Sequence, residues 1–279
     1  MISVCILTLW RETIYQTLET VFSQQVSSEY EVVIVLQWEI NINKVDQLNK
    51  NNVHYSVHSY PHWLWFGFYR NKSIEHSSGD ILVWIDDDEW AQDKHWLEFL
   101  VKPILIWKYQ VVTAVYCIPL WQWYLSDGIS LIGYPGWGAL GFDKVWNVYI
   151  DSTTLHLCGG NFAITRHLLD KVGFFEKKCI YSCDDTHLAW KIILASEKIF
   201  YEPKCTLFHV ARNRKNFCSW AENRRKWMKD YYLIANNPGL LADKKKHIFN
   251  IFKYLFKNPK YLPGFFYLMF LFLYSKYFN

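Results

Sequence analysis

The sequence predicts an α/β fold in which a Rossmann-like, mainly parallel sheet is flanked by helices. Two observations predict it. Several apolar runs are rich in β-branched residues and are continuous, which is typical of strands buried on both faces of a parallel sheet. These runs alternate along the chain with segments whose apolar residues recur at helical spacing, as in α/β proteins.

The first elements follow one another closely. Residues 2–9 (ISVCILTL) predict a strand, and residues 12–24 predict a helix because their apolar side chains fall on one helical face. A second strand is predicted over residues 31–36 (EVVIVL) and a short third over residues 53–58 (VHYSVH). The chain therefore begins with strand and helix signals typical of an α/β unit.

The next two elements complete this half of the sheet. A helix is predicted over residues 70–76, ending near the Ser-Ser-Gly turn of residues 77–79. The fourth strand follows over residues 80–85 (DILVWI). The first half of the chain is therefore predicted to be α/β.

Composition limits the class of protein. A chain of 279 residues with 51% hydrophobic content can bury a large core, as one domain with or without an appendage. The formal net charge of +4 is too small to indicate nucleic-acid binding. Seven cysteines without a CxxC pair, and an N-terminus without a signal-like apolar core, predict a cytoplasmic protein.

Three consecutive aspartates, Asp86, Asp87 and Asp88, follow the fourth predicted strand directly. Ligands of open parallel sheets bind beyond the carboxyl ends of the strands, so Asp88 is expected to be hydrated there and not part of the core. Carboxylates this close together suit Mg²⁺ or Mn²⁺, which share their ligand shell with water and phosphates. The alternative is an acidic surface turn, or the N-cap of a helix beginning near Glu89.

Three later segments carry further signals. Residues 157–176 (LCGGNFAITRHLLDKVGFFE) contain a glycine pair that lets backbone approach a ligand closely, then a helix and a glycine turn. Residues 183–192 (CDDTHLAWKI) place an acidic pair at the start of a helix. Residues 207–212 (LFHVAR) end an apolar strand on a histidine.

Together with SVCILT at residues 3–8 and the segment 70–89, the order of these motifs resembles the family 2 glycosyltransferases of the GT-A fold. It is most similar to bacterial enzymes that transfer exopolysaccharide and lipopolysaccharide sugars. The resemblance covers about residues 1–230, and its specificity comes from the order and spacing of the motifs. It implies a GT-A catalytic domain over residues 1–230 and a helical C-terminal extension over residues 231–279.

The resemblance implies roles for the aspartate cluster. Asp86 and Asp87 would contact the nucleotide-sugar, with Asp86 approaching the ribose. Asp88 would bind Mn²⁺ or Mg²⁺ on the diphosphate, and His209 would be a further metal ligand. A histidine at a strand end also serves structural roles, and that alternative stays open.

Other positions would contact the nucleotide-sugar as well. Thr8 and Trp10 would meet the nucleobase; a tryptophan replaces the usual tyrosine, and its indole can stack on a base or pack in the core. Arg70 would lie near the ribose and diphosphate, because guanidinium suits phosphate geometry, or would form a surface ion pair. Gly160 and Asn161 complete this predicted set.

The acidic pair would supply the catalytic base. In the family the second acid is the catalytic one, which corresponds to Asp185, while Asp184 replaces a more common glutamate. The alternative is helix capping, since aspartates at a helix start accept backbone N–H bonds. Both roles are compatible, with Asp184 capping and Asp185 reacting.

The sequence departs from the family pattern in two places. Residues 36–39 (LQWE) lack the aspartate that reads the base in most members, so the nucleobase is undetermined. Residues 222–227 (ENRRKW) lack the signature of processive members, which argues for transfer of a single sugar. Arg224 or Arg225 would grip the leaving diphosphate or lie on a solvated helix face.

These roles imply an inverting, metal-dependent glycosyltransferase. One carboxylate takes the proton of an acceptor hydroxyl as it attacks the anomeric carbon, and the nucleoside diphosphate leaves from the opposite side. The acceptor would be a glycan or a lipid-linked glycan. The alternatives are a glycan-binding protein without turnover and a sugar-nucleotide pyrophosphorylase, although no glycine-rich nucleotidyl loop stands near the N-terminus.

The C-terminal segment differs in composition. From Lys244 onward it carries seven lysines and no acidic residue, interleaved with aromatic residues. The apolar run of residues 262–274 is short and interrupted by Pro263 and Gly264, so it does not predict a membrane span. A basic aromatic segment can lie in the interface of an anionic leaflet at the cytosolic face of a membrane. The alternatives are a helical hairpin packed on the catalytic domain and, more weakly, nucleic-acid binding; no nucleic-acid partner is expected.

Overall fold

The computed structural model describes residues 1–8, 11–37, 39–61, 66–106, 108–117, 152–154, 157–177 and 184–209. Trp10, Arg224, Arg225 and the extension 231–279 lie outside these ranges. What the sequence predicts for them stays a prediction.

The first half of the chain forms the parallel part of the sheet. β1 (Ile2–Thr8) lies between β2 (Tyr30–Leu36) and β4 (Ile81–Asp86), and β3 (His54–Ser59) pairs with the outer side of β2. All of these pairs are parallel. The four strands agree with the predicted ones to within one or two residues at each end.

Three helices connect these strands. They are α1 (Thr13–Phe22), α2 (Ile42–Leu48) and α3 (Phe66–Glu75). α3 begins four residues before its predicted start, and Gly67 in its first turn packs on the carbonyl oxygen of Glu176, which a Cβ would approach to 2.2 Å. The start of α3 therefore contacts a segment more than a hundred residues away in the sequence. The local spacing of apolar residues cannot predict this contact.

The second half extends the sheet with mixed strand directions. Its elements are β5 (Glu89–Ala91), α4 (Trp96–Leu105), β6 (Val111–Cys117), β7 (Ser152–Thr154), β8 (Phe162–Thr165), α6 (Arg166–Val172), α7 (Asp184–Leu194) and β9 (Ile199–His209). The strand order among the described residues is β3-β2-β1-β4-β8-β6-β9-β5, with β7 also paired to β9. β8 is antiparallel to β4 and β6, whereas β9 runs parallel to β6.

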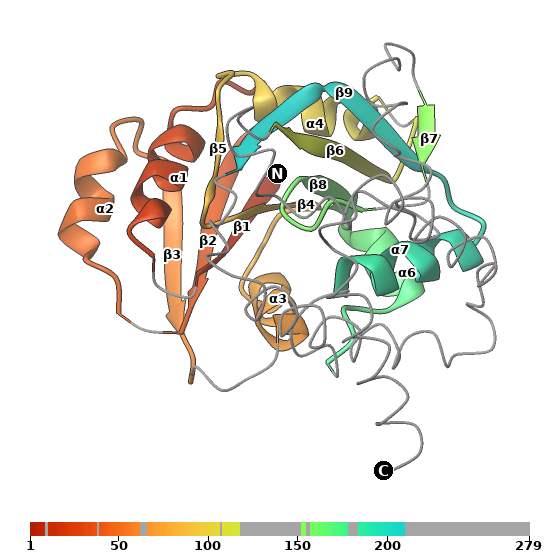
Figure 1. Ribbon diagram of the computed structural model, residues 1–279, viewed down its shortest axis with the longest axis horizontal. Helices are drawn as coiled ribbons and strands as arrows, with labels where there is room; N and C mark the ends of the chain where they lie inside the picture. Colours follow the sequence, from red (N-terminus) through yellow and green to blue (C-terminus); the bar gives the residue numbers. More distant parts are fainter. Residues whose placement is uncertain are drawn as a thin grey trace, which may run out of the picture.

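Both faces of the sheet are covered, as the continuous apolar strands predict. Successive residues of β1 alternate between two buried clusters, with Val4 and Ile6 in one and Cys5 and Leu7 in the other. The first cluster includes the apolar sides of α1 and α4, and the second includes those of α3, α6 and α7. Figure 1 shows α4 on one side of the sheet and α3, α6 and α7 on the other. Among the described helices, none is long and apolar enough to cross a bilayer.

The helix predicted as one alternative near Glu89 does not form. Residues 89–91 are a short strand instead, because Glu89 pairs with His209 and Trp90 pairs with Phe208 on β9. The rings of Trp90 and Phe208 lie 4.9 Å apart, centroid to centroid. The three aspartates are therefore not the N-cap of a helix, and the β4–β5 turn places them beside the end of β9.

Candidate functional site

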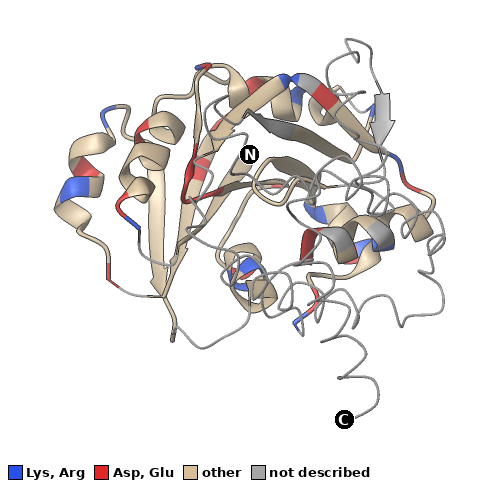
Figure 2. Ribbon diagram, viewed as in Figure 1, with Lys and Arg blue, Asp and Glu red and all other residues tan. Residues whose placement is uncertain are grey.

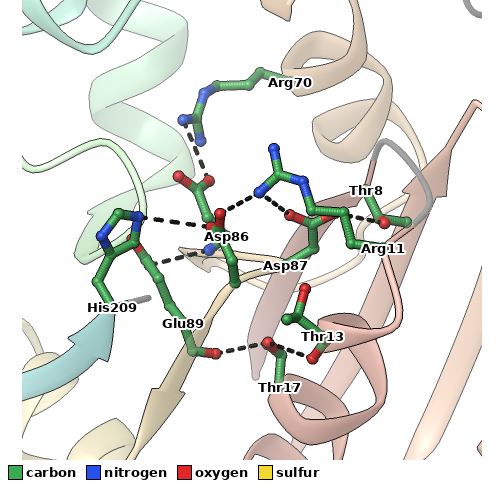
Figure 3. A network of polar contacts seen from close by, with 10 residues as sticks. Thr8, Arg11, Thr13, Thr17, Arg70, Asp86, Asp87, Glu89 and His209 are labelled. Atoms are coloured by element: carbon green, nitrogen blue, oxygen red, sulfur yellow. Dashed lines mark hydrogen bonds and ion pairs between the residues drawn. The ribbon is translucent and has the colours of Figure 1, made fainter. Parts of the chain in front are cut away.

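Polar side chains gather where β1, β4 and β9 end (Figure 3). Thr8 is the last residue of β1, Asp86 of β4 and His209 of β9. Figure 2 shows the acidic run, which continues from Asp86 through Glu89, at the junction of β4 and β5. Strands far apart in the sequence thus bring these side chains to one edge of the sheet.

Asp87 and Asp88 are held by neighbouring side chains. The Thr8 hydroxyl donates to Asp87 Oδ2 at 2.7 Å, and Arg11 Nη1 lies 3.0 Å from Asp87 Oδ1. Arg11 Nη1 also pairs with Asp88 Oδ2, while Asp88 Oδ1 lies 3.7 Å from His209 Nε2. Both aspartates are buried, so the expectation of a hydrated Asp88 and the surface-turn alternative are wrong. The Arg11 guanidinium supplies the positive charge that makes this burial tolerable.

Glu89 stabilises the β4–β5 turn through a hydrogen bond to its backbone. It is fully buried, and its Oε2 accepts a hydrogen bond from the backbone N–H of Asp86 at 3.1 Å. The Thr17 hydroxyl on α1 donates to the backbone carbonyl of Glu89 at 2.6 Å. Gly160 packs directly against the Glu89 carboxylate, since a Cβ at this glycine would stand 2.3 Å from Glu89 Oε2. The close approach predicted for the glycine pair is therefore made to the protein's own carboxylates.

Arg70 joins the β4 edge to α7. Its side chain is only 2% exposed, its Nε donates to Asp184 Oδ2, and its Nη2 lies 3.9 Å from Asp86 Oδ1. The surface ion pair considered for Arg70 is therefore a buried one. Asp185, the next residue of α7, lies against Gly159, where a Cβ would stand 2.9 Å from Asp185 Oδ2. Gly159 thus leaves room for the Asp185 carboxylate beside Arg70.

The charges of Arg70 and Asp86 are set by burial and by each other. Burial raises the pKa of Asp86 to about 7, against the opposing effect of Arg70. Burial alone would lower the pKa of Arg70, but Asp184 and the other nearby aspartates outweigh it and raise that pKa. Within the described parts of the chain, Asp86 Oδ1 and Arg70 Nη1 have no hydrogen-bond partner. Buried polar atoms of this kind indicate a place for a polar ligand.

Asn161 does not join the cluster. It is fully buried, its carboxamide oxygen accepts from Trp96 Nε1 at 3.0 Å, and its Nδ2 donates to the carbonyl of Cys205 at 3.1 Å. The expectation that its side chain contacts a nucleotide-sugar is therefore wrong. Asn161 instead ties the start of β8 to α4 and β9.

Two residues of the site, Arg11 and Glu89, were not among the predicted ones. Arg11 follows the first predicted strand, where a basic residue at a carboxyl end is a signal for an anion or a carboxylate partner. Glu89 is the fourth acid of an acidic run, but only its pairing with His209 reveals that it points into the protein. Arg11 could have been predicted from its position after the first strand, whereas the role of Glu89 could not have been predicted from the sequence.

The sequence model of glycosyl transferase family 2 matches residues 3–173, more than half of the chain. The chain belongs to glycosyl transferase family 2. The predicted family is therefore confirmed, and the protein is a glycosyltransferase. No match was found among curated proteins.

Solved structures similar to this transferase have the GT-A fold. The mannosyltransferase PcManGT from Pyrobaculum calidifontis, in complex with GDP-Man and Mn²⁺, is 17% identical with a TM-score of 0.64, covering 94% of this chain and 72% of that chain. Staphylococcus aureus TarS 1–349, in complex with UDP-GlcNAc, is 16% identical with a TM-score of 0.59, covering 88% and 69% respectively. GalNAc-T7, with UDP, GalNAc and Mn²⁺, is 15% identical with a TM-score of 0.58, and the transferase covers only 51% of it.

Proposed function

We propose that this transferase moves one sugar from a nucleotide-sugar donor to a hydroxyl of a glycan or lipid-linked acceptor, with inversion at the anomeric carbon. The observation that carries this proposal is a pair of buried polar atoms, Arg70 Nη1 and Asp86 Oδ1, which have no hydrogen-bond partner among the described residues. They lie between the aspartate turn and Asp185. A nucleotide-sugar presents ribose hydroxyls and phosphate oxygens, which satisfy a guanidinium donor and a carboxyl acceptor.

The donor would be bound by groups of different kinds. Asp86 would accept from the ribose, and Arg70 Nη1 would donate to a donor oxygen while its Nε stays on Asp184. Thr8, whose hydroxyl is engaged by Asp87, and Trp10 stay proposed for the nucleobase side. Asp87 and Gly160 would act by shaping this edge, because their contacts are to the protein itself.

A divalent cation, Mn²⁺ or Mg²⁺, fits the residues at the end of β9. The described residues contain no cluster of three or more His, Cys, Asp or Glu arranged to hold a metal. Asp88 Oδ1 and His209 Nε2, 3.7 Å apart, offer two ligands of suitable type. Such a cation takes its other ligands from water and substrate phosphates, and when bound it would neutralise the charge of the leaving diphosphate.

Asp185 is proposed as the general base. An acceptor hydroxyl is a weak nucleophile near neutral pH, and a carboxylate within reach removes its proton as it attacks. Asp185 is half-buried at the first turn of α7, whereas Asp184 is buried against Arg70. Asp184 is accordingly assigned to positioning Arg70, and a single base on one face leads to inversion.

Acceptor and location are proposed from sequence character. The acceptors of bacterial exopolysaccharide and lipopolysaccharide synthesis, which are glycans and lipid-linked glycans, are the proposed class. The basic, aromatic extension 231–279 is proposed to contact the cytosolic face of an anionic membrane. The domain boundary near residue 230 is proposed on the same basis.

Asp185→Asn tests the function. Asn keeps the shape and accepts hydrogen bonds but cannot take a proton, so turnover should fall about 10²–10⁴-fold with unchanged nucleotide affinity. Asp170→Asn, an exposed aspartate on α6, is the matched control and should behave like the wild type. Turnover is measured as nucleoside diphosphate released with a lengthened acceptor, and affinity as the thermal shift with UDP or GDP and Mn²⁺.

The products separate the alternatives. Released pyrophosphate would indicate a pyrophosphorylase, and acceptor binding without any product would indicate a glycan-binding protein. Wild-type turnover by Asp185→Asn would refute the assigned base.

A further inference from the structure

We propose that Arg11 is an internal counter-ion that competes with the divalent cation for Asp88, so that the cation binds firmly only together with the donor diphosphate. This inference rests on the proposed function, in which Asp88 and His209 hold the cation. Arg11 thereby sets how strongly metal and donor depend on each other.

Arg11 is placed for this role by the turn between β1 and α1. Its backbone carbonyl accepts the N–H of Ile14 at 3.0 Å, so the residue lies directly before the helix. Its side chain reaches the acidic turn, with Nη1 3.0 Å from Asp87 Oδ1 and paired to Asp88 Oδ2 (Figure 3). The side chain is 26% exposed, so it lies at the boundary between the buried turn and solvent.

The charge at this edge explains why a counter-ion is needed. Among the described residues of the site, six carboxylates accompany two guanidinium groups. The carboxylates belong to Asp86, Asp87, Asp88, Glu89, Asp184 and Asp185, and the guanidinium groups to Arg11 and Arg70. Without Arg11 the two adjacent buried aspartates, Asp87 and Asp88, would lose the guanidinium group that contacts both of them. Like charges this close repel strongly where water is excluded.

The same contact hinders a cation. Asp88 Oδ1 faces His209, and Asp88 Oδ2 is paired with Arg11. A metal ion bound to Oδ1 would therefore be repelled by the Arg11 guanidinium on the other oxygen of the same carboxylate. A divalent cation therefore binds Asp88 only against repulsion from Arg11, or after the guanidinium has left. The diphosphate brings negative charge that offsets this repulsion.

Metal and nucleotide should consequently bind with positive coupling. Coupling free energies are reciprocal, so the factor by which the diphosphate tightens the metal equals the factor by which the metal tightens the diphosphate. If Arg11 is the source of the repulsion, removing its charge should tighten the metal alone and reduce that factor.

The experiment is calorimetry of Mn²⁺ with the full chain, alone and at saturating UDP or GDP, for wild type and Arg11→Gln. We expect Arg11→Gln to bind Mn²⁺ alone at least tenfold more tightly, and the coupling factor to fall by about the same ratio. Arg11→Lys, which keeps the charge, should return both values toward wild type. Lys50→Gln removes an exposed positive charge before β3, at the opposite edge of the sheet, and should change neither.

If Arg11→Gln does not fold, the double variant Arg11→Gln with Asp87→Asn is used for the same comparison. The amide oxygen of Asn still accepts from Thr8, and one of the two adjacent negative charges is removed together with the guanidinium. Unchanged or weaker Mn²⁺ binding in the folded charge-removed variant would overturn the competition and leave Arg11 a structural residue. If wild type binds no Mn²⁺ even with nucleotide, the metal dependence of the proposed function fails, and this inference is overturned with it. Tighter Mn²⁺ binding in that variant, reversed by Arg11→Lys, supports it.

Discussion

Gly160→Ala, which adds a single methyl group, is expected to lower the turnover of the transferase strongly. The added Cβ would stand 2.3 Å from Glu89 Oε2 and 2.8 Å from Asp86 Cγ, so Glu89 must retreat about 1.1 Å to reach ordinary contact at 3.4 Å. Glu89 is fully buried and its Oε2 holds the Asp86 N–H, so it cannot turn away without losing that bond. Asp86 is pushed directly as well.

The size of the effect follows from that displacement. A shift of about 1 Å in a positioning group costs about 10² in rate, so turnover should fall roughly 100-fold. Overpacking should lower the free energy of unfolding by about 1–3 kcal/mol, which leaves most molecules folded. The assay pairs nucleoside diphosphate release under saturating donor with urea unfolding of the same preparation.

Gly79→Ala is the matched control. Its Cβ would stand 2.6 Å from the backbone nitrogen of Ser3, a comparable clash beside the start of β1, at the opposite end of that strand. It should lose stability but keep the turnover of each folded molecule. Wild-type turnover by folded Gly160→Ala would refute the argument that Glu89 and Asp86 are positioned through this glycine.

Two further predictions concern buried charges. Arg70→Met should cost about 3–5 kcal/mol because Asp184 is left buried without its cation, and adding Asp184→Leu should restore much of the loss in urea unfolding; a single-variant cost below 1 kcal/mol would contradict this. Glu31 is buried, which alone would raise its pKa, but hydrogen bonds from Ser3 and Ser78 outweigh burial and lower it. Glu31→Gln should therefore cost about 1–3 kcal/mol at pH 7. Because the folded pKa is the lower one, that difference from wild type should shrink as pH falls below about 4.5, through the folded-state pKa; a pH-independent difference would refute it.

Local sequence alone determined the parallel half of the fold and the edge at which the site lies. The strands β1, β2 and β4 read as continuous apolar runs because both of their faces are buried. The polar residue that follows such a run must lie at the carboxyl edge, so the position of Asp86 was predicted without any knowledge of packing, whereas Thr8 was singled out through the family resemblance. The acidic start of α7 was predicted for the same local reason.

Only the tertiary structure decided what each of these side chains contacts. Local spacing cannot show that β9 pairs with residues 89–91, that Arg70 contacts Asp184, or that Arg11 bridges Asp87 and Asp88, because the partners in each of these contacts lie far apart along the chain. The contact of Arg11 with Asp88 reversed the expectation of a hydrated Asp88, and the contacts of Asn161 with Trp96 and Cys205 reversed the expectation of a ligand-facing Asn161. The physical reason is that burial and charge depend on which distant segments share an edge, whereas strand and helix periodicity depends only on near neighbours.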